Sequence, residues 1–217
     1  MAKIAHIFDE GGWMMYIILF WLVFAWGFII ERAIFLYKSS INRDVFLATM
    51  QKCILAGDIG RAIKLCSAAN APLARIVKAG LMRVNRPDAE VQAAMDETAL
   101  RELPLVEKRT PYLALFANLA MLSGLLGTVI GLIQAFAAVA GADAASKAVL
   151  LAKGISEAMN CTAFGLFAAL VALIGFAILN GKTQSIIDDI NGATVQVMNL
   201  VTNNRSKINL GGGAPAA

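Results

Sequence analysis

Three long stretches without a single charged residue constrain what this chain can fold into. They cover residues 13–30, 112–142 and 158–180, and the shortest has eighteen residues. An α-helix rises 1.5 Å per residue, so eighteen residues reach about 27 Å, close to the roughly 30 Å of hydrocarbon in a bilayer. Charged residues make up only 16% of the chain, against about 25% in soluble domains. The sequence therefore predicts an all-α integral membrane protein with three transmembrane helices.

The first stretch has a competing interpretation as a cleaved signal peptide. A signal peptide has a basic start and a small-residue cleavage site. Here Asp9 and Glu10 precede the stretch, and Glu31 and Arg32 follow it directly. This arrangement favours a first span that is kept in the membrane.

The second and third stretches are expected to form an antiparallel hairpin, because only about fifteen residues separate them. The second stretch has thirty-one residues, and as a helix it would measure about 46 Å, which is longer than the bilayer core. We therefore expect it to tilt or to project from the membrane at one end.

Lysine and arginine near span ends predict the orientation, because they concentrate on the cytoplasmic side. Residues 31–110 carry thirteen of them, whereas residues 1–12 carry only Lys3. The predicted organisation is, in chain order, a periplasmic N-terminus at 1–12, a transmembrane helix at 13–30, a cytoplasmic helical domain at 31–110, a transmembrane helix at 111–140, a periplasmic connection at 141–156, a transmembrane helix at 157–181 and a cytoplasmic tail at 182–217.

The cytoplasmic segment shows no alternating strand pattern and is expected to be helical throughout. Asn42 and Asp58 can cap two helices, Pro72 can open a third, and a longer helix begins at Pro87-Asp88. Within that last helix, Val91, Ala94, Met95 and Leu103 are expected to share one face. Pro104 and Pro111 are expected to kink it where it approaches the second span.

The residues that usually carry chemistry are few. The only histidine is His6, and Cys53, Cys66 and Cys161 do not have the spacing of metal ligands. We therefore expect no enzyme activity, no metal site and no cofactor, and we interpret the cysteines as small buried hydrophobes. The thirteen basic residues of the cytoplasmic segment alternate with nine acidic ones, which argues against nucleic-acid binding.

Small residues recur at helical spacing in the second and third spans. Such patterns let helix backbones approach closely, and packing alone is sufficient to explain them. In the third span, Ala158, Gly165 and Ala172 follow helical spacing and form a stripe of small residues on one face. The residues predicted to pack the helices are Ser123, Gly124, Gly127, Gly131, Gly165 and Ala169.

Two threonines stand within these small-residue stripes. By helix rise, Thr128 and Thr162 can lie in one layer in the outer half of the bilayer. Glu157 stands at the outer edge of the third span, and Asn160 lies one turn below it. These four residues are the candidate polar pathway. They supply no acid at mid-membrane, so a proton path built from this chain alone is incomplete.

Two segments carry a family resemblance: GLLGTVIGL around Thr128 and ISEAMNCTAFGL around Thr162. They resemble the signature helices of the MotA/TolQ/ExbB proton-channel family, and most of all its TolQ and ExbB branch. The three-span topology is similar to that branch, whereas the flagellar stator branch has four spans. The sequence departs from the branch at Asn160-Cys161, where small or apolar residues are commoner.

The resemblance implies a homopentamer whose second and third spans surround a pore. Two helices of a TolR- or ExbD-like single-span partner would occupy that pore, each with a proton-carrying aspartate. By motif position, Thr128 and Thr162 match pore-facing threonines, and Glu157 matches the third-span glutamate of the family.

The function implied is that of a motor subunit in a bacterial inner membrane. It would use the proton motive force to energise an outer-envelope process, which can be transport, envelope maintenance or gliding motility. The partner would act on a periplasmic or outer-membrane effector, and membrane lipids would surround the pentamer. The alternative hypothesis is a membrane scaffold or assembly protein that does not conduct ions.

Overall fold

The computed structural model describes residues 12–205 of the 217-residue chain. His6, most of the predicted N-terminal segment and the end of the predicted tail lie outside the described residues. Every secondary-structure element in the described part is an α-helix, and three helical segments are long and apolar enough to cross a membrane. The predicted fold class is thereby confirmed. The helices are α2 (Met14–Ser39), α3 (Arg43–Leu55), α4 (Ile59–Ala68), α5 (Pro72–Met82), α6 (Asp88–Glu107), α7 (Thr110–Ala140) and α8 (Ala144–Asn203).

The described chain divides into two compact units. The first comprises residues 12–32 and 109–179, and the second comprises residues 33–108 and 180–205. The first unit therefore holds most of α2, all of α7 and the first part of α8. The second holds α3 to α6 and the last part of α8.

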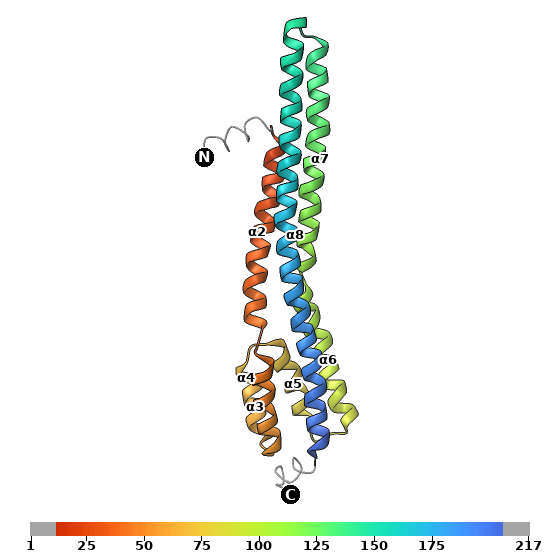
Figure 1. The fold of residues 1–217 in the computed structure, drawn as a ribbon. Helices are drawn as coiled ribbons and strands as arrows, with labels where there is room; N and C mark the ends of the chain where they lie inside the picture. The colour runs from red at the N-terminus through yellow and green to blue at the C-terminus, as the bar shows by residue number, and fades with distance from the viewer. Residues whose placement is uncertain (1–11, 206–217) are drawn as a thin grey trace. The chain divides into compact units, whose positions relative to one another are not determined.

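In the first unit, α7 and α8 form the predicted antiparallel hairpin (Figure 1). A methyl group built on Gly131 would lie 3.1 Å from the Cβ atom of Ala158. One built on Gly154 would meet Ala135. As residue numbers rise along α7 they fall along α8, which is the register of two antiparallel helices.

Helix α2 packs along this hairpin through apolar side chains. Met14 and Met15 contact Cys161 near the start of α2, and Ala25 packs with Phe116 and Ala169 further along. At the other end of the span, Arg109 Nη1 lies 2.5 Å from Glu31 Oε1. Both side chains of this ion pair are about half exposed, so its net stabilisation is at most about 1 kcal/mol.

The turn between α7 and α8 is short. Helix α8 begins at Ala144, where the Asp143 carbonyl oxygen accepts from the backbone N–H groups of Ser146 and Lys147. The segment that follows contains alanine, leucine and lysine, which are strong helix formers. Most of the connection at 141–156 is therefore helix rather than loop, and the helix extends beyond the predicted start of the third span.

The helix boundary lies between the two prolines at which kinks were predicted. Pro104 lies inside α6, which continues to Glu107. The backbone breaks at Lys108 and Arg109, where Arg109 adopts a positive φ of 74°. Pro111 lies in the first turn of α7, where a helix does not need its missing N–H. The break therefore lies between the prolines.

The second unit confirms the predicted helix starts. Asn42 Oδ1 accepts from the Val45 N–H at 3.3 Å, and Asp58 Oδ1 accepts from the Arg61 N–H at 2.8 Å. Pro72 begins α5. Of the face predicted for α6, the residues Val91, Ala94 and Met95 are buried and Leu103 is half-buried.

Candidate functional site

Two threonine hydroxyls meet between α7 and α8. Thr128 Oγ1 and Thr162 Oγ1 form a hydrogen bond with each other. The Gly124 carbonyl oxygen lies 3.1 Å from Thr128 Oγ1 and 3.3 Å from Thr162 Oγ1. The Ala158 carbonyl oxygen lies 3.4 Å from Thr128 Oγ1. The two threonines that the sequence placed in one layer are thus in direct contact, and we call them the threonine pair.

Small residues on both helices make this contact possible. A methyl group on Gly124 would lie 3.0 Å from the Cα atom of Gly165, and one on Gly127 would lie 2.9 Å from the Cβ atom of Cys161. Nothing larger than hydrogen fits at these positions without moving a helix. Of the residues predicted to pack the spans, Ser123 is half-buried and the others are buried: Gly124, Gly127, Gly131, Gly165 and Ala169.

The threonine pair lies on the side of the hairpin that faces away from α2. Ile130 on α7 and Phe164 on α8 pack against the cluster of Met14, Met15 and Cys161. Each threonine stands two positions before one of these residues, which is about 200° around its helix. Both threonines are half-buried, so part of each residue is open to the surroundings of the hairpin.

The chemistry of the threonine pair follows from its donors and acceptors. A hydroxyl has one proton to donate and two lone pairs that accept. One hydroxyl donates to the other, and the second proton is directed to a backbone carbonyl. Because each hydroxyl has a carbonyl within reach, the direction of this short chain can reverse. The pair can therefore accept a hydrogen bond from a hydrated proton or a carboxylic acid, but the proton must be carried by another group.

Glu157 lies in a different environment, at a small pocket beside the start of α2. The pocket is lined by Glu157, Gln134 and residues of all three helices of the first unit. A methyl group on Gly12 would lie 2.5 Å from Glu157 Oε1. Gly12 has a positive φ of 65° and stands just before α2. The remaining lining residues are Trp13, Met14, Gly127, Ile130, Gly131 and Cys161.

Asn160 also lies on the α2 side of the hairpin. It stands four positions before Phe164 and so shares that face of α8, and it is half-buried. The structure thus brings Thr128 and Thr162 together. It places Glu157 and Asn160 on the other side of the hairpin.

Sequence reasoning missed two residues near Glu157. Gln134 lines the same pocket. It could have been predicted from the register of the hairpin, because α7 and α8 pair Gly131 with Ala158. Gly12 carried no such signal, because its contact with Glu157 depends on how α2 packs. A glycine directly before a span gives no indication of which side chain it contacts in the folded protein.

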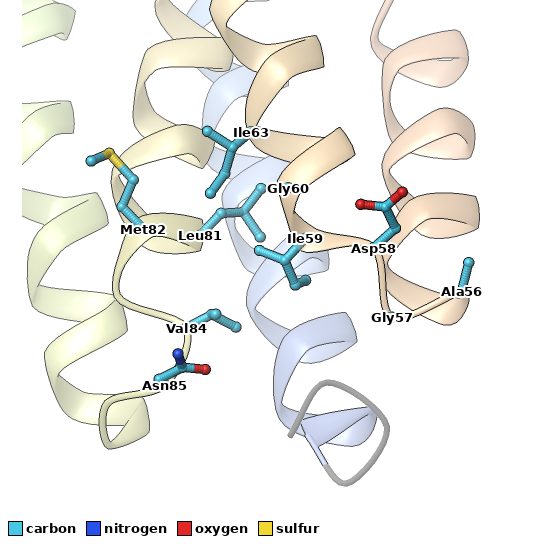
Figure 2. Close-up of a pocket in the computed structure, with 10 residues that line it drawn as sticks. All are labelled: Ala56, Gly57, Asp58, Ile59, Gly60, Ile63, Leu81, Met82, Val84 and Asn85. Carbon is cyan, nitrogen blue, oxygen red and sulfur yellow. The ribbon is translucent and has the colours of Figure 1, made fainter. Parts of the chain in front are cut away.

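A pocket of about 530 Å³ lies in the second unit, between the α3–α4 turn and the end of α5 (Figure 2). Asp58 and Asn85 are its polar side chains, and Asp58 is engaged in capping α4. Among residues 12–205 there is no group of three histidine, cysteine or acidic side chains that could hold a metal ion. The remaining lining residues are Ala56, Gly57, Ile59, Gly60, Ile63, Leu81, Met82 and Val84.

The cysteines of the described chain are all buried and unpaired by disulfides. Cys66 lies in the core of the second unit, where its thiol donates to Met50 Sδ at 3.9 Å. Burial is the main cause that raises the pKa of the Cys66 thiol to about 11. A neutral thiol of this kind is a poor nucleophile at neutral pH.

Comparison with known proteins gives a consistent result. Residues 68–191 match the MotA/TolQ/ExbB proton channel family. The chain is 29% identical over 165 residues to the biopolymer transport protein ExbB-like 3 of Synechocystis sp., covering 76% of this chain and 79% of that protein. It is 31% identical over 180 residues to ExbB-like 1 of the same organism, covering 79% and 68%. It is also 38% identical over 106 residues to the Tol-Pal system protein TolQ of Haemophilus influenzae, covering 48% and 46%.

The fold and the matches define a subunit of a proton-channel-type membrane complex. The match covers more than half of the chain and includes the threonine pair and Glu157. The chain belongs to the MotA/TolQ/ExbB proton channel family, in its TolQ/ExbB branch. This is a family of channel and transport subunits that act in complexes, not a family of enzymes.

Proposed function

We propose that this protein is the motor subunit of a TolQ/ExbB-like complex in a bacterial inner membrane. Five copies surround a pore with α7 and α8, and a TolR/ExbD-like dimer of single-span helices occupies it. Proton flow through the pore energises an outer-envelope process through that partner. The N-terminus is periplasmic and the C-terminus is cytoplasmic.

The threonine pair is the observation that carries this proposal. Its two residues are half-buried and lie on the side of the hairpin that faces away from α2, which suits a surface directed toward a pore. The pair offers reversible hydrogen bonding but no acid, so it requires a partner that brings one. The partner aspartate implied by the family supplies that group.

The alternative is a scaffold that does not conduct ions. The close approach of Gly124 to Gly165 favours it, because helix packing alone is a sufficient reason for small residues in these spans. The two functions differ in what the threonine hydroxyls do. In a scaffold, only the shape of each threonine matters.

The test replaces each threonine with valine. Thr128→Val and Thr162→Val keep nearly the same shape and remove one hydroxyl. We expect each variant to assemble normally with its partner and to lose proton conduction in reconstituted vesicles. Thr128→Ser and Thr162→Ser, which retain the hydroxyl, should keep most of the conduction.

Thr183→Val is the matched control for this experiment. The Thr183 hydroxyl is buried and has no hydrogen-bond partner among the described residues, so the same exchange there removes no hydrogen bond. We expect conduction of the Thr183→Val variant to equal that of the unaltered protein. Normal conduction in both Thr128→Val and Thr162→Val would instead establish the scaffold.

We further propose that Glu157 shapes the outer entrance and is not the obligatory proton carrier. It stands at the edge of the third span, beside the start of α2, whereas a carrier must cross the middle of the membrane. Glu157→Gln should therefore reduce conduction partially, and Glu157→Ala should reduce it more. An Asp→Asn variant of the partner should abolish it. Complete loss in Glu157→Gln together with a conducting partner variant would reverse this assignment.

A further inference from the structure

The Glu157 carboxylate lies against the turn before α2, closer to Gly12 than a residue with a Cβ atom at that position would allow. Glu157 Oε1 lies 2.5 Å from the position that a Cβ atom on Gly12 would occupy, and Glu157 Cδ lies 3.6 Å from it. Real Cβ atoms do not approach an oxygen atom so closely. Any residue other than glycine at position 12 must displace the carboxylate or the turn.

The backbone at position 12 gives a second, independent reason for glycine. Its φ of 65° lies in the left-handed region, which residues with a Cβ atom enter at a cost. The Gly12 carbonyl oxygen accepts from the Met15 N–H at 3.2 Å, so this turn starts α2. The turn that starts α2 therefore lies against the Glu157 carboxylate.

The Glu157 carboxylate lies beside a small pocket whose other lining residues are apolar except for Gln134. The pocket around Glu157 is lined by Trp13 and Met14 from the start of α2, by Gln134 from α7 and by Cys161 one turn further along α8. The carboxylate is also close to the N-terminal end of α2, where the unpaired N–H groups of a helix favour negative charge. A displaced Glu157 would lose this position.

We infer that Gly12 is a positioning residue for Glu157. Because Gly12 has no Cβ atom, the Glu157 carboxylate can occupy its place at the outer end of the hairpin. The importance of this position for conduction rests on the proposed function of Glu157. The contact itself does not, so the two can be tested separately.

The contact is tested by a double-mutant cycle on thermal stability. Gly12→Ala and Glu157→Ala are made singly and together in the full chain, and Tm of the purified protein in detergent is measured. Backbone strain at position 12 is present with or without Glu157, so it cancels from the cycle. We expect Gly12→Ala to lower Tm clearly less in the Glu157→Ala background than alone. An equal decrease in both backgrounds would overturn the inference.

The effect on function is tested by shortening the acid. Glu157→Asp withdraws the carboxylate by one methylene group and keeps its charge. We expect Gly12→Ala to reduce proton conduction severalfold, and we expect Gly12→Ala with Glu157→Asp to conduct better than Gly12→Ala alone. Failure of this rescue would count against positioning through Glu157.

Gly27→Ala is the control, because it adds the same methyl group within α2 at a position where no other part of the described chain lies within 4 Å. It should conduct normally. If the stability cycle shows coupling while Glu157→Gln conducts as well as the unaltered protein, the positioning contact stands. In that case it is the proposed role of Glu157 that fails.

Discussion

Cys66 shows what burial does to a single titratable residue in this chain. Its thiol is 1% exposed and has a pKa of about 11, against an ordinary value of 9.0. Between these pH values the unfolded chain loses the proton and the folded chain keeps it. Stability from this residue is therefore complete below about pH 9 and decreases as the pH rises toward 11.

The expected decrease is at most about 3 kcal/mol, since one pKa unit corresponds to about 1.4 kcal/mol. The measurement is chemical unfolding of the purified protein between pH 8 and 11, compared with Cys66→Ala. The difference in unfolding free energy between the two proteins should shrink across this range. A constant difference would contradict a buried, neutral thiol.

Residue identity alone was sufficient to nominate Thr128 and Thr162, because hydroxyls are conspicuous in an apolar span. Their hydrogen bond was beyond sequence reasoning, since it depends on the register and separation of two helices. Glu157 was also found from sequence, but its contact with Gly12 was not. That contact joins residues 145 positions apart and depends on the packing of a third helix.

At the scale of helices, the separation of α7 and α8 controls the threonine pair. A methyl group on Gly165 would lie 2.8 Å from the Cα atom of Gly124 and 2.9 Å from the Ala120 carbonyl oxygen. These are backbone atoms and cannot rotate away as a side chain can. Gly165→Ala must therefore push the helices apart.

We expect Gly165→Ala to destabilise the protein by about 1 to 3 kcal/mol, the usual range for overpacking, and to abolish conduction although both threonines are unchanged. The control is Gly181→Ala on the same helix, where nothing lies within 4 Å of the added methyl group. Thermal unfolding and conduction of the two variants should be compared. Equal Tm values would mean that the helices are not in contact at Gly165.

Helix starts were more predictable than helix ends in this chain. Asn42, Asp58 and Pro72 each began a helix as expected, because capping and proline act within three or four residues. Kinks were predicted at Pro104 and Pro111, and the break at Lys108 and Arg109 between them was not predicted. A positive φ in an arginine has no sequence signal, since arginine has no preference for the left-handed region.

For the whole molecule, three charge-free stretches were enough to predict an all-helical membrane protein, because a bilayer leaves the backbone little choice but helix. Composition could not indicate what the protein assembles with. The family match supplies the class of complex. The orientation in the membrane still rests on the distribution of basic residues.

That orientation can be measured by cysteine labelling. The native cysteines are first replaced, and a single cysteine is then introduced at Gly141 or at Asn85. Gly141 lies at the turn between α7 and α8 with open space around its Cβ position, and Asn85 is exposed between α5 and α6. A membrane-impermeant maleimide reaches each of them from one side only.

Because residues 31–110 carry thirteen lysines and arginines, the positive-inside tendency places Asn85 in the cytoplasm and Gly141 in the periplasm. We expect Gly141→Cys to react in cells whose outer membrane alone is permeabilised. Asn85→Cys should react only after the inner membrane is opened. The reverse pattern would show that the topology is inverted. The threonine pair would then lie in the inner half of the bilayer, and Glu157 would lie at the cytoplasmic side and could not form a periplasmic entrance.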